Sequence, residues 1–183
     1  GKSPTYVHKS ADISLSAKRI CWGKFLNCGQ LCIAPDYVLI DEDVLDEFVD
    51  EMKKAIQIRF GADIKNSPNY GKIISADHTN RIASFLKEDH KGKIILGGTI
   101  EEKNRYISPT LVLNPSKESK LANEEIFGPI LPIFPLKGGL NEALVLIRLK
   151  NTPLASYVFA GDNRTLHKFV NLVQSGSTCV NDV

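Results

Sequence analysis

Cys32 is the residue whose type and setting best suit covalent chemistry. It lies in the run FLNCGQLCIAPDY, residues 25–37, where a glycine precedes it and a proline follows it. Such a run is typical of a connection between packed elements, where catalytic groups are often held. A thiolate in an exposed, electropositive setting is a strong nucleophile, and loop N–H groups beside an element end can favour it. From this window alone, however, a small buried thiol is the commoner outcome.

The other cysteines are expected to be structural. Cys28 could be a redox partner of Cys32 or a metal ligand, but no histidine lies nearby to complete a metal site. Cys21 and Cys179 fall on a predicted helix and a predicted strand. We expect all four cysteines to be reduced thiols in a reducing compartment. Four isolated histidines are expected at the surface or satisfied by hydrogen bonds: His8, His78, His90 and His167.

Apolar spacing indicates the elements that must position these residues. Helices are expected at 13–27, 44–56, 78–88, 141–149 and 164–174. Strands are expected at 37–40, 93–96, 106–113, 130–136, 154–160 and 177–183. Asp41 or Asp43 can cap the second helix, Pro109 breaks its strand or places it at an edge, and residues 61–71 and 117–125 read as loops. The alternation favours an α/β domain with a largely parallel sheet flanked by helices.

The composition limits the classes of protein to which the chain can belong. The chain has 183 residues, of which 43% are apolar and 24% charged, as in one globular domain with a real core. A net charge of +2 is too small and too evenly spread to indicate nucleic acid or an acidic membrane surface. The sequence shows neither a membrane-spanning apolar run nor a signal-peptide pattern. Both ends look cut, so we expect part of a longer protein.

Several segments together resemble the aldehyde dehydrogenase superfamily. Residues 29–32, GQLC, resemble the family's cysteine signature, and residues 1–4, GKSP, resemble the tail of its glutamate signature, E-x-G-G-K-S-P. Residues 124–129, EEIFGP, and the stretch 97–110, with GG followed by YI-x-PT, resemble two further segments in the family's order. The segments APDYVL, NYGKII and PLA point to the class 3-like branch, which handles fatty and aromatic aldehydes.

The resemblance implies roles for three residues. Cys32 would be the nucleophile that forms a thiohemiacetal and then a thioester, which water hydrolyses to a carboxylic acid. Glu125 and Phe127 match positions that hold the nicotinamide ribose of NAD or NADP, where a carboxylate suits the hydroxyls and a ring gives an apolar face. No metal is implied. The fold implied is the family's catalytic domain, which residues 1–183 would represent incompletely.

Parts of the family's machinery lie outside these residues. The NAD-binding domain, the oxyanion asparagine and the C-terminal arm have no counterpart here, and the general-base glutamate would lie three residues before Gly1. We therefore expect the isolated 183 residues to be inactive. The resemblance also implies a small aldehyde substrate, no nucleic acid and a homodimer. It places the protein in the cytoplasm or on an organelle membrane facing the cytosol, with membrane association only through a missing C-terminal tail.

Other functions stay open. The chain could belong to a non-catalytic relative that serves a structural or interaction role in a larger assembly. A cysteine-dependent hydrolase or acyltransferase without NAD would need a histidine base near Cys32, and the sequence offers no obvious candidate. An acylating member of the superfamily could pass the thioester to coenzyme A, although the class 3-like segments argue weakly against it.

Overall fold

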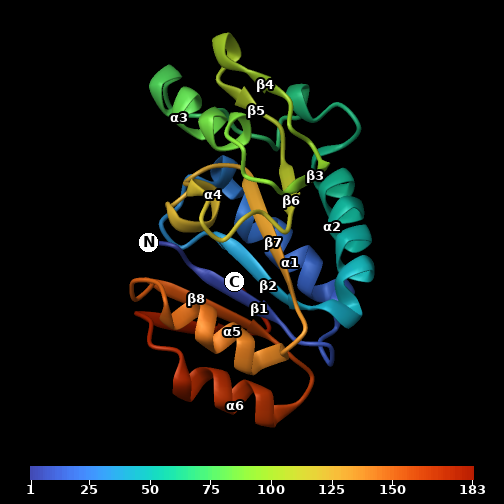
Figure 1. Ribbon diagram of the computed structural model, residues 1–183. Helices are drawn as coiled ribbons and strands as arrows, with labels where there is room; N and C mark the ends of the chain where they lie inside the picture. The colour runs from blue at the N-terminus through green and yellow to red at the C-terminus, as the bar shows by residue number, and fades with distance from the viewer.

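A seven-stranded, mostly parallel sheet forms the frame of the protein. The structure is a computed structural model that describes all residues 1–183 (Figure 1). Only β3 runs antiparallel to its neighbour, β6; every other adjacent pair is parallel. Across the sheet the strands follow in this order: β3 (Lys93–Leu96), β6 (Thr110–Leu113), β7 (Ile130–Leu136), β2 (Tyr37–Asp41), β1 (Pro4–Val7), β8 (Ala155–Phe159) and β9 (Ser177–Val180).

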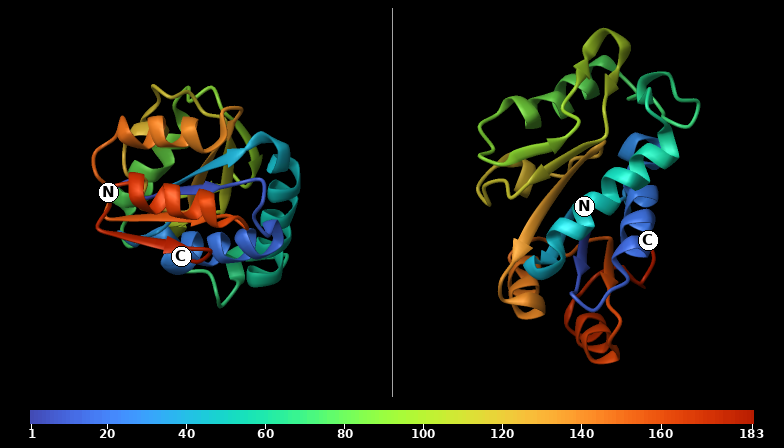
Figure 2. Two further views of the ribbon diagram at one scale, coloured as in Figure 1. Left: turned by 90° about the horizontal axis from the view of Figure 1, so that it is seen from below. Right: turned by 90° about the vertical axis from the view of Figure 1, so that its right-hand side faces the viewer.

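Helices cover both faces of the sheet (Figure 2). One face carries α1 (Ile13–Phe25) and α2 (Leu45–Phe60), and the other carries α5 (Gly139–Arg148) and α6 (Asn163–Leu172). At the upper end in Figure 1 lie α3 (Ala76–Lys87) and a two-stranded ribbon of β4 (Ile100–Glu101) and β5 (Tyr106–Ile107). The predicted α/β class with a largely parallel sheet is confirmed.

The helix faces follow the apolar spacing of the sequence. On α2, Phe48, Met52 and Ile56 recur at intervals of four and are buried, while Lys53 is exposed between them. The larger core, of 31 buried residues, lies on the α1 and α2 side, and the opposite side has a core of 12. The connection from α1 to β2, which carries Cys32, is therefore anchored on the more extensive core.

Several predicted elements are confirmed with small shifts in their ends. The helices at 13–27, 78–88, 141–149 and 164–174 correspond to α1, α3, α5 and α6. The predicted strand with a break at Pro109 is two strands, β5 and β6. β6 lies inside the sheet, and β7, its neighbour, carries two prolines although it too is an interior strand. No helix is long and apolar enough to cross a bilayer.

Three local features differ from expectation. β1 was not among the predicted strands: its four residues include a proline and a threonine, and it forms because β2 and β8 pair with it on both sides. The predicted loop at 117–125 contains a short helix, α4 (Lys120–Asn123), because Leu121 and Ala122 are buried against the core. The predicted strand at the C-terminal end stops at Val180.

The predicted cap of α2 is wrong. Asp41 ends β2, and its carboxylate accepts hydrogen bonds from the Tyr6 hydroxyl at 2.8 Å and from the Lys9 N–H at 2.9 Å. Asp43 lies in a short 3-10 turn that makes no side-chain cap, and α2 begins at Leu45 without one. Because the Asp41 carboxylate already accepts hydrogen bonds from Tyr6 and Lys9, it does not cap the N-terminus of α2.

Candidate functional site

The chain reverses sharply between the end of α1 and Cys32. After α1 ends at Phe25, the next residues form a 3-10 turn in which Asn27, Cys28 and Gly29 have φ values of 49°, 60° and 74°. Left-handed backbone at two non-glycine residues in succession is uncommon and persists only where the surroundings hold it. The turn is therefore imposed by its contacts, which come from two other segments of the chain.

Gln30 supplies the first set of contacts. Its side-chain amide donates to the carbonyls of Asn27 at 3.0 Å and Lys72 at 3.1 Å, and its oxygen accepts from the N–H of Ile74 at 2.9 Å. The Cys28 thiol donates to the carbonyl of Gly71 at 3.2 Å. These bonds tie the turn to residues 71–74, the segment that leads into α3.

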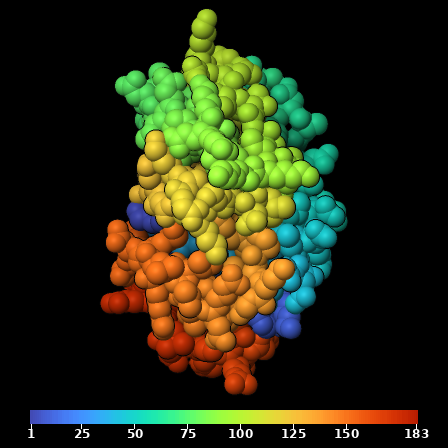
Figure 3. Space-filling model, in the orientation of Figure 1, coloured from blue at the N-terminus to red at the C-terminus, as the bar shows by residue number.

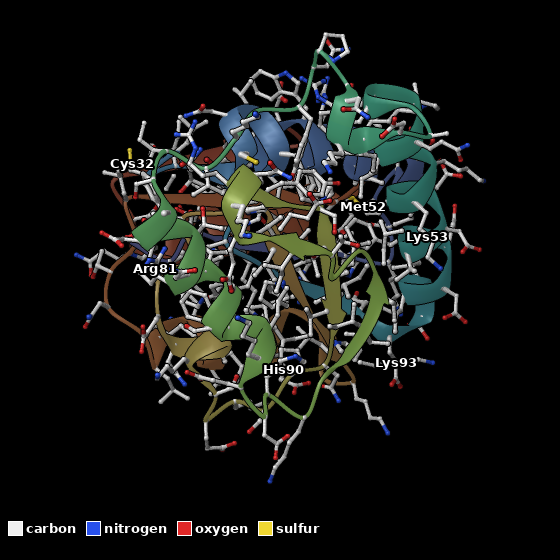
Figure 4. All side chains as sticks on the ribbon, turned by 90° about the horizontal axis from the view of Figure 1, so that it is seen from above. Cys32, Met52, Lys53, Arg81, His90 and Lys93 are labelled. Atoms are coloured by element: carbon white, nitrogen blue, oxygen red, sulfur yellow. The ribbon has the colours of Figure 1, made fainter.

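Cys32 itself is exposed on the connection that follows. One residue beyond it, the carbonyl of Ile33 accepts a hydrogen bond from the Tyr157 hydroxyl of β8. The thiol is therefore presented on a backbone that is fixed on both sides, by Gln30 before it and by Tyr157 after it. Figure 4 shows Cys32 on the same side of the molecule as Arg81 of α3, opposite Lys53 of α2.

The segment 124–128, which contains Glu125 and Phe127, is held by side chains from two directions. Lys2 donates to the carbonyl of Glu124 at 2.9 Å, and Arg81 donates to the carbonyls of Glu125, at 3.2 Å, and of Ile126. Side-chain and backbone groups thus fix a stretch that has no regular secondary structure. Figure 3 shows dark blue N-terminal residues at the left, between the yellow and the orange parts of the chain.

The two predicted site segments touch each other at a pair of glycines. A Cβ placed on Gly29 would overlap the carbonyl oxygen of Gly128, and a Cβ on Gly128 would lie 2.5 Å from Cδ1 of Ile82 on α3. Only glycine permits backbones to approach this closely. The structure therefore brings the Cys32 connection against the segment of Glu125 and Phe127, although more than ninety residues separate Cys32 from Glu125 in the sequence.

The whole chain, residues 1–183, matches the aldehyde dehydrogenase family. The protein belongs to this family. It is 40% identical over 183 residues to the mouse "aldehyde dehydrogenase, dimeric NADP-preferring", and 40% identical to mouse "aldehyde dehydrogenase family 3 member A2". These alignments cover 100% of this chain but only 40% and 37% of the two relatives, so the chain spans about two fifths of their length.

Solved aldehyde dehydrogenases share the fold. The substrate-bound Staphylococcus aureus AldH superposes with a TM-score of 0.96 at 38% identity, covering 100% of this chain and 40% of that one. The NAD-dependent aldehyde dehydrogenase of Sinorhizobium meliloti gives a TM-score of 0.90 at 27% identity, with 100% and 37% coverage. The aldehyde dehydrogenase resemblance and fold predicted from the sequence motifs are confirmed.

The thiols of this aldehyde dehydrogenase chain differ in their surroundings. Burial raises the pKa of the Cys21 thiol to about 12, against a smaller opposing attraction to Arg59. Burial also raises the pKa of the Cys28 thiol to about 11. Both are poor nucleophiles at neutral pH because the thiolate is the reactive form. Cys32 is the exposed thiol of the turn region, which leaves it as the nucleophile candidate that solvent can reach.

A buried charge cluster lies behind the segment of Glu125. Lys2 forms an ion pair with Asp36, whose other oxygen accepts from the N–H of Ile126 at 3.0 Å. Lys24, at the end of α1, is fully buried, and burial lowers its pKa to about 8, assisted by repulsion from Lys2 and opposed by Asp36 and Glu125. Buried charges of this kind persist only where partners surround them.

Glu125 and Phe127 have the exposure that a cofactor contact requires. The Glu125 side chain is 35% exposed, so its carboxylate is accessible to a ligand. The Phe127 ring is half-buried, with its centroid 5.9 Å from that of His78. An accessible carboxylate beside an apolar ring fits the hydroxyls and adjoining ring of a nicotinamide ribose.

The sequence interpretation assigned no role to Arg81, Lys2 or Gln30 as supports of the site. Arg81 and His78 are spaced three residues apart on one predicted helix, which places them on the same helix face. That spacing predicts a shared helix face, but it does not identify the residues that this face contacts. The acceptors of Arg81 and Lys2 are backbone carbonyls, which no side-chain motif records.

Proposed function

We propose that the full-length protein oxidises an aldehyde to a carboxylic acid with NAD or NADP, and that Cys32 is its nucleophile. Residues 1–183 would then be the catalytic domain in incomplete form. The observation that carries this proposal is the contact between the Cys32 connection and the segment of Glu125 and Phe127 at Gly29 and Gly128. It brings the turn before an exposed thiol against the segment that carries a candidate cofactor-binding carboxylate.

The residues of this chain suit such a reaction. The Cys32 thiolate would attack the aldehyde carbon and form a C–S bond, and negative charge would develop on the former carbonyl oxygen. A backbone N–H of the same connection can donate to that oxygen. When bound, the cofactor supplies the acceptor for the hydride that is lost as the thiohemiacetal becomes a thioester. Water then releases the acid, and the Cys32 sulfur departs as a thiolate.

Glu125 and Phe127 would hold the cofactor at its nicotinamide ribose, the carboxylate by accepting from hydroxyls and the ring by covering an apolar edge. The relatives' names support either cofactor, since one is called NADP-preferring and a solved neighbour is called NAD-dependent. For the substrate we propose a fatty or aromatic aldehyde. A further relative, from Staphylococcus aureus, is named 4,4'-diaponeurosporen-aldehyde dehydrogenase at 39% identity.

A homodimer is part of the same proposal, because the mouse relative is named dimeric. No contact in the structure favours the alternative, a non-catalytic relative with a structural role. Packing does not require an exposed thiol on a fixed turn, so a structural role would leave Cys32 unexplained. Acyl transfer to coenzyme A is distinguished by the product: the oxidation proposed here releases a free acid without added coenzyme A.

The test uses the full-length protein with NAD or NADP and a series of fatty and aromatic aldehydes. We expect reduced cofactor and free acid in equal amounts, and a loss of at least about a thousandfold in Cys32→Ser, as when a nucleophile is removed. Cys179→Ser is the matched control and should keep wild-type turnover. Absence of turnover in the wild type with every aldehyde, or full activity in Cys32→Ser, would overturn the proposal.

A further inference from the structure

Four consecutive backbone carbonyls between Glu124 and Phe127 each accept a hydrogen bond from a side chain. Lys2 donates to the carbonyl of Glu124, and Arg81 donates to the carbonyls of Glu125 and Ile126. His78 bonds to the carbonyl of Phe127, with a distance of 3.0 Å from Nε2 to the oxygen. Loop carbonyls commonly bond to water or to backbone N–H groups. These side chains come from α3 and from the residues before β1, which indicates that contacts from outside the segment determine its conformation.

The segment needs such support because Phe127 has a φ of 50°. A bulky residue in the left-handed region is a true outlier, and it persists where neighbouring contacts over-determine it. His78 bonds to the carbonyl of this very residue. The next residue, Gly128, packs directly against Ile82 one helical turn further along α3. The α3 face therefore meets the segment at the point where its backbone is strained.

Arg81 and His78 also bond to each other, which fixes the protonation of the imidazole. The Arg81 Nε–H donates to Nδ1 of His78 at 3.2 Å. A guanidinium stays protonated and can only donate, so Nδ1 must be the accepting nitrogen. Nε2 then carries the single imidazole proton and donates it to the Phe127 carbonyl. A second proton on Nδ1 would face the Arg81 N–H, so the arrangement requires a neutral His78.

We propose that Arg81 and neutral His78 are positioning residues that act as one clamp on the backbone of residues 125–127. By holding these carbonyls, the clamp sets where the Glu125 carboxylate and the Phe127 ring lie. The proposal rests on the proposed function in one respect, namely that Glu125 and Phe127 contact the cofactor. In this proposal α3 determines the geometry of that contact, and neither Arg81 nor His78 takes part in the chemical step.

The surrounding charges keep the Arg81 half of the clamp ionised. Burial lowers the pKa of Arg81, while three carboxylates on neighbouring segments oppose that shift. The ionisable acids around the pair are Glu124, Glu125 and Asp36, together with the exposed Asp77 on α3. These acids favour the guanidinium, so Arg81 keeps the Nε proton that it donates to Nδ1 of His78.

Glutamine is the informative substitution at position 78. Its amide can donate to the Phe127 carbonyl and accept from Arg81, as the neutral imidazole does, but it cannot take a second proton. In the full-length protein we expect His78→Ala and Arg81→Ala to weaken NAD or NADP binding about tenfold or more, with kcat changed much less, because each variant removes hydrogen bonds of the clamp. His78→Gln should bind within about twofold of the wild type.

The comparison of His78→Ala with His78→Gln separates positioning from simple folding, because only glutamine keeps a donor for the Phe127 carbonyl and an acceptor for Arg81. Asn80→Ala, at an exposed position of α3, is the matched control and should leave the cofactor Kd unchanged. Melting curves identify any variant that fails to fold; the comparison of the wild type with His78→Gln stays decisive even then.

A readout independent of cofactor binding is the imidazole tautomer. In protein labelled with ¹⁵N-histidine, the His78 signal, assigned by its loss in His78→Gln, should show a protonated Nε2 and a bare Nδ1 near neutral pH. The opposite tautomer or a charged ring would overturn the clamp, as would a defect in His78→Gln equal to that of His78→Ala. If the tautomer is as expected but Glu125→Gln binds cofactor like the wild type, the proposed role of Glu125 fails instead.

Discussion

Gly29 and Gly128 are in backbone contact, and this single approach joins the turn before Cys32 to the segment of Glu125. A Cβ on Gly29 would meet the Gly128 carbonyl, and Gly29 has a φ of 74°. The position therefore excludes side chains for two independent reasons, one conformational and one steric. Gly61, at the end of α2, has a similar φ of 78° but open space around it.

Gly29→Ala should separate these reasons when compared with Gly61→Ala. Both variants place a side chain at a positive φ, which costs about 1–2 kcal/mol or more in the free energy of unfolding. Only Gly29→Ala must also push the two segments apart, so we expect it to lose at least about tenfold in aldehyde turnover beyond any loss in Gly61→Ala. Denaturant unfolding and steady-state kinetics measure the two effects. Equal turnover in the two variants would show that the contact is not needed.

The Gln30 side chain should contribute more to the free energy of unfolding than the side chain of an exposed helical glutamine. Gln30→Ala removes three hydrogen bonds and leaves the Ile74 N–H without its acceptor, so we expect a loss of roughly 1–3 kcal/mol in the free energy of unfolding. Gln57→Ala, on the exposed side of α2, should change it by less than about 0.5 kcal/mol. The urea midpoints of the two variants check this, and matching midpoints would contradict it.

Lys24 should make stability depend on alkaline pH. Its pKa in the folded protein, about 8, lies below its ordinary value of 10.5. Between those values the unfolded chain holds more protons than the folded one, so the free energy of unfolding rises with pH across this window. Lys24→Met should abolish that rise and raise stability near neutral pH by roughly 1–3 kcal/mol, because the desolvated charge is gone.

Lys53→Met is the control for this titration, since Lys53 is exposed on α2. Its stability profile between about pH 7 and about pH 10.5 should follow that of the wild type. Chemical denaturation across this range compares the three proteins. A wild-type profile that is flat relative to Lys24→Met would mean that Lys24 keeps an ordinary proton affinity in the folded state.

Alkylation should distinguish the cysteines by order of reaction. Under native conditions near pH 8, iodoacetamide should modify Cys32 well before Cys28 or Cys21, whose pKa values are raised to about 11 and about 12 by burial. In urea all of them should react at similar rates. Peptide mass spectrometry after timed quenching measures the order, and early labelling of Cys28 would contradict the structure.

The fold was largely accessible from the sequence because most elements carry their own periodic signal. The apolar face of α2 repeats clearly, and the punctuated run at 130–136 is recognisably β7. β1 has no such signal: Thr5 faces a fully buried setting, and the strand exists only through its partners on either side. The cap predicted at Asp41 failed for a similar reason, because Tyr6 and Lys9 reach it from that same part of the chain.

The candidate site also has one part that the sequence predicts and another part that it does not. Cys32, Glu125 and Phe127 were predicted because side-chain identity at fixed spacing carries the family resemblance. The supports of the site act on backbone atoms instead: Arg81 on the carbonyl of Glu125, and Gln30 on that of Lys72. Every residue offers a carbonyl, so such contacts leave no mark in the sequence of the segment they hold.

The central position of β1 also orders the events of synthesis. β1 pairs with β2, about thirty residues further along the chain, and with β8, about one hundred and fifty residues further along. While the chain is still being extended on the ribosome, one edge of β1 must wait unpaired until Tyr157 and its neighbours emerge. Parallel pairing over such a span forms late and leaves a strand edge open to wrong partners. The pairing of β1 with β8, inside the sheet, thus forms only after most of residues 1–183 have been made.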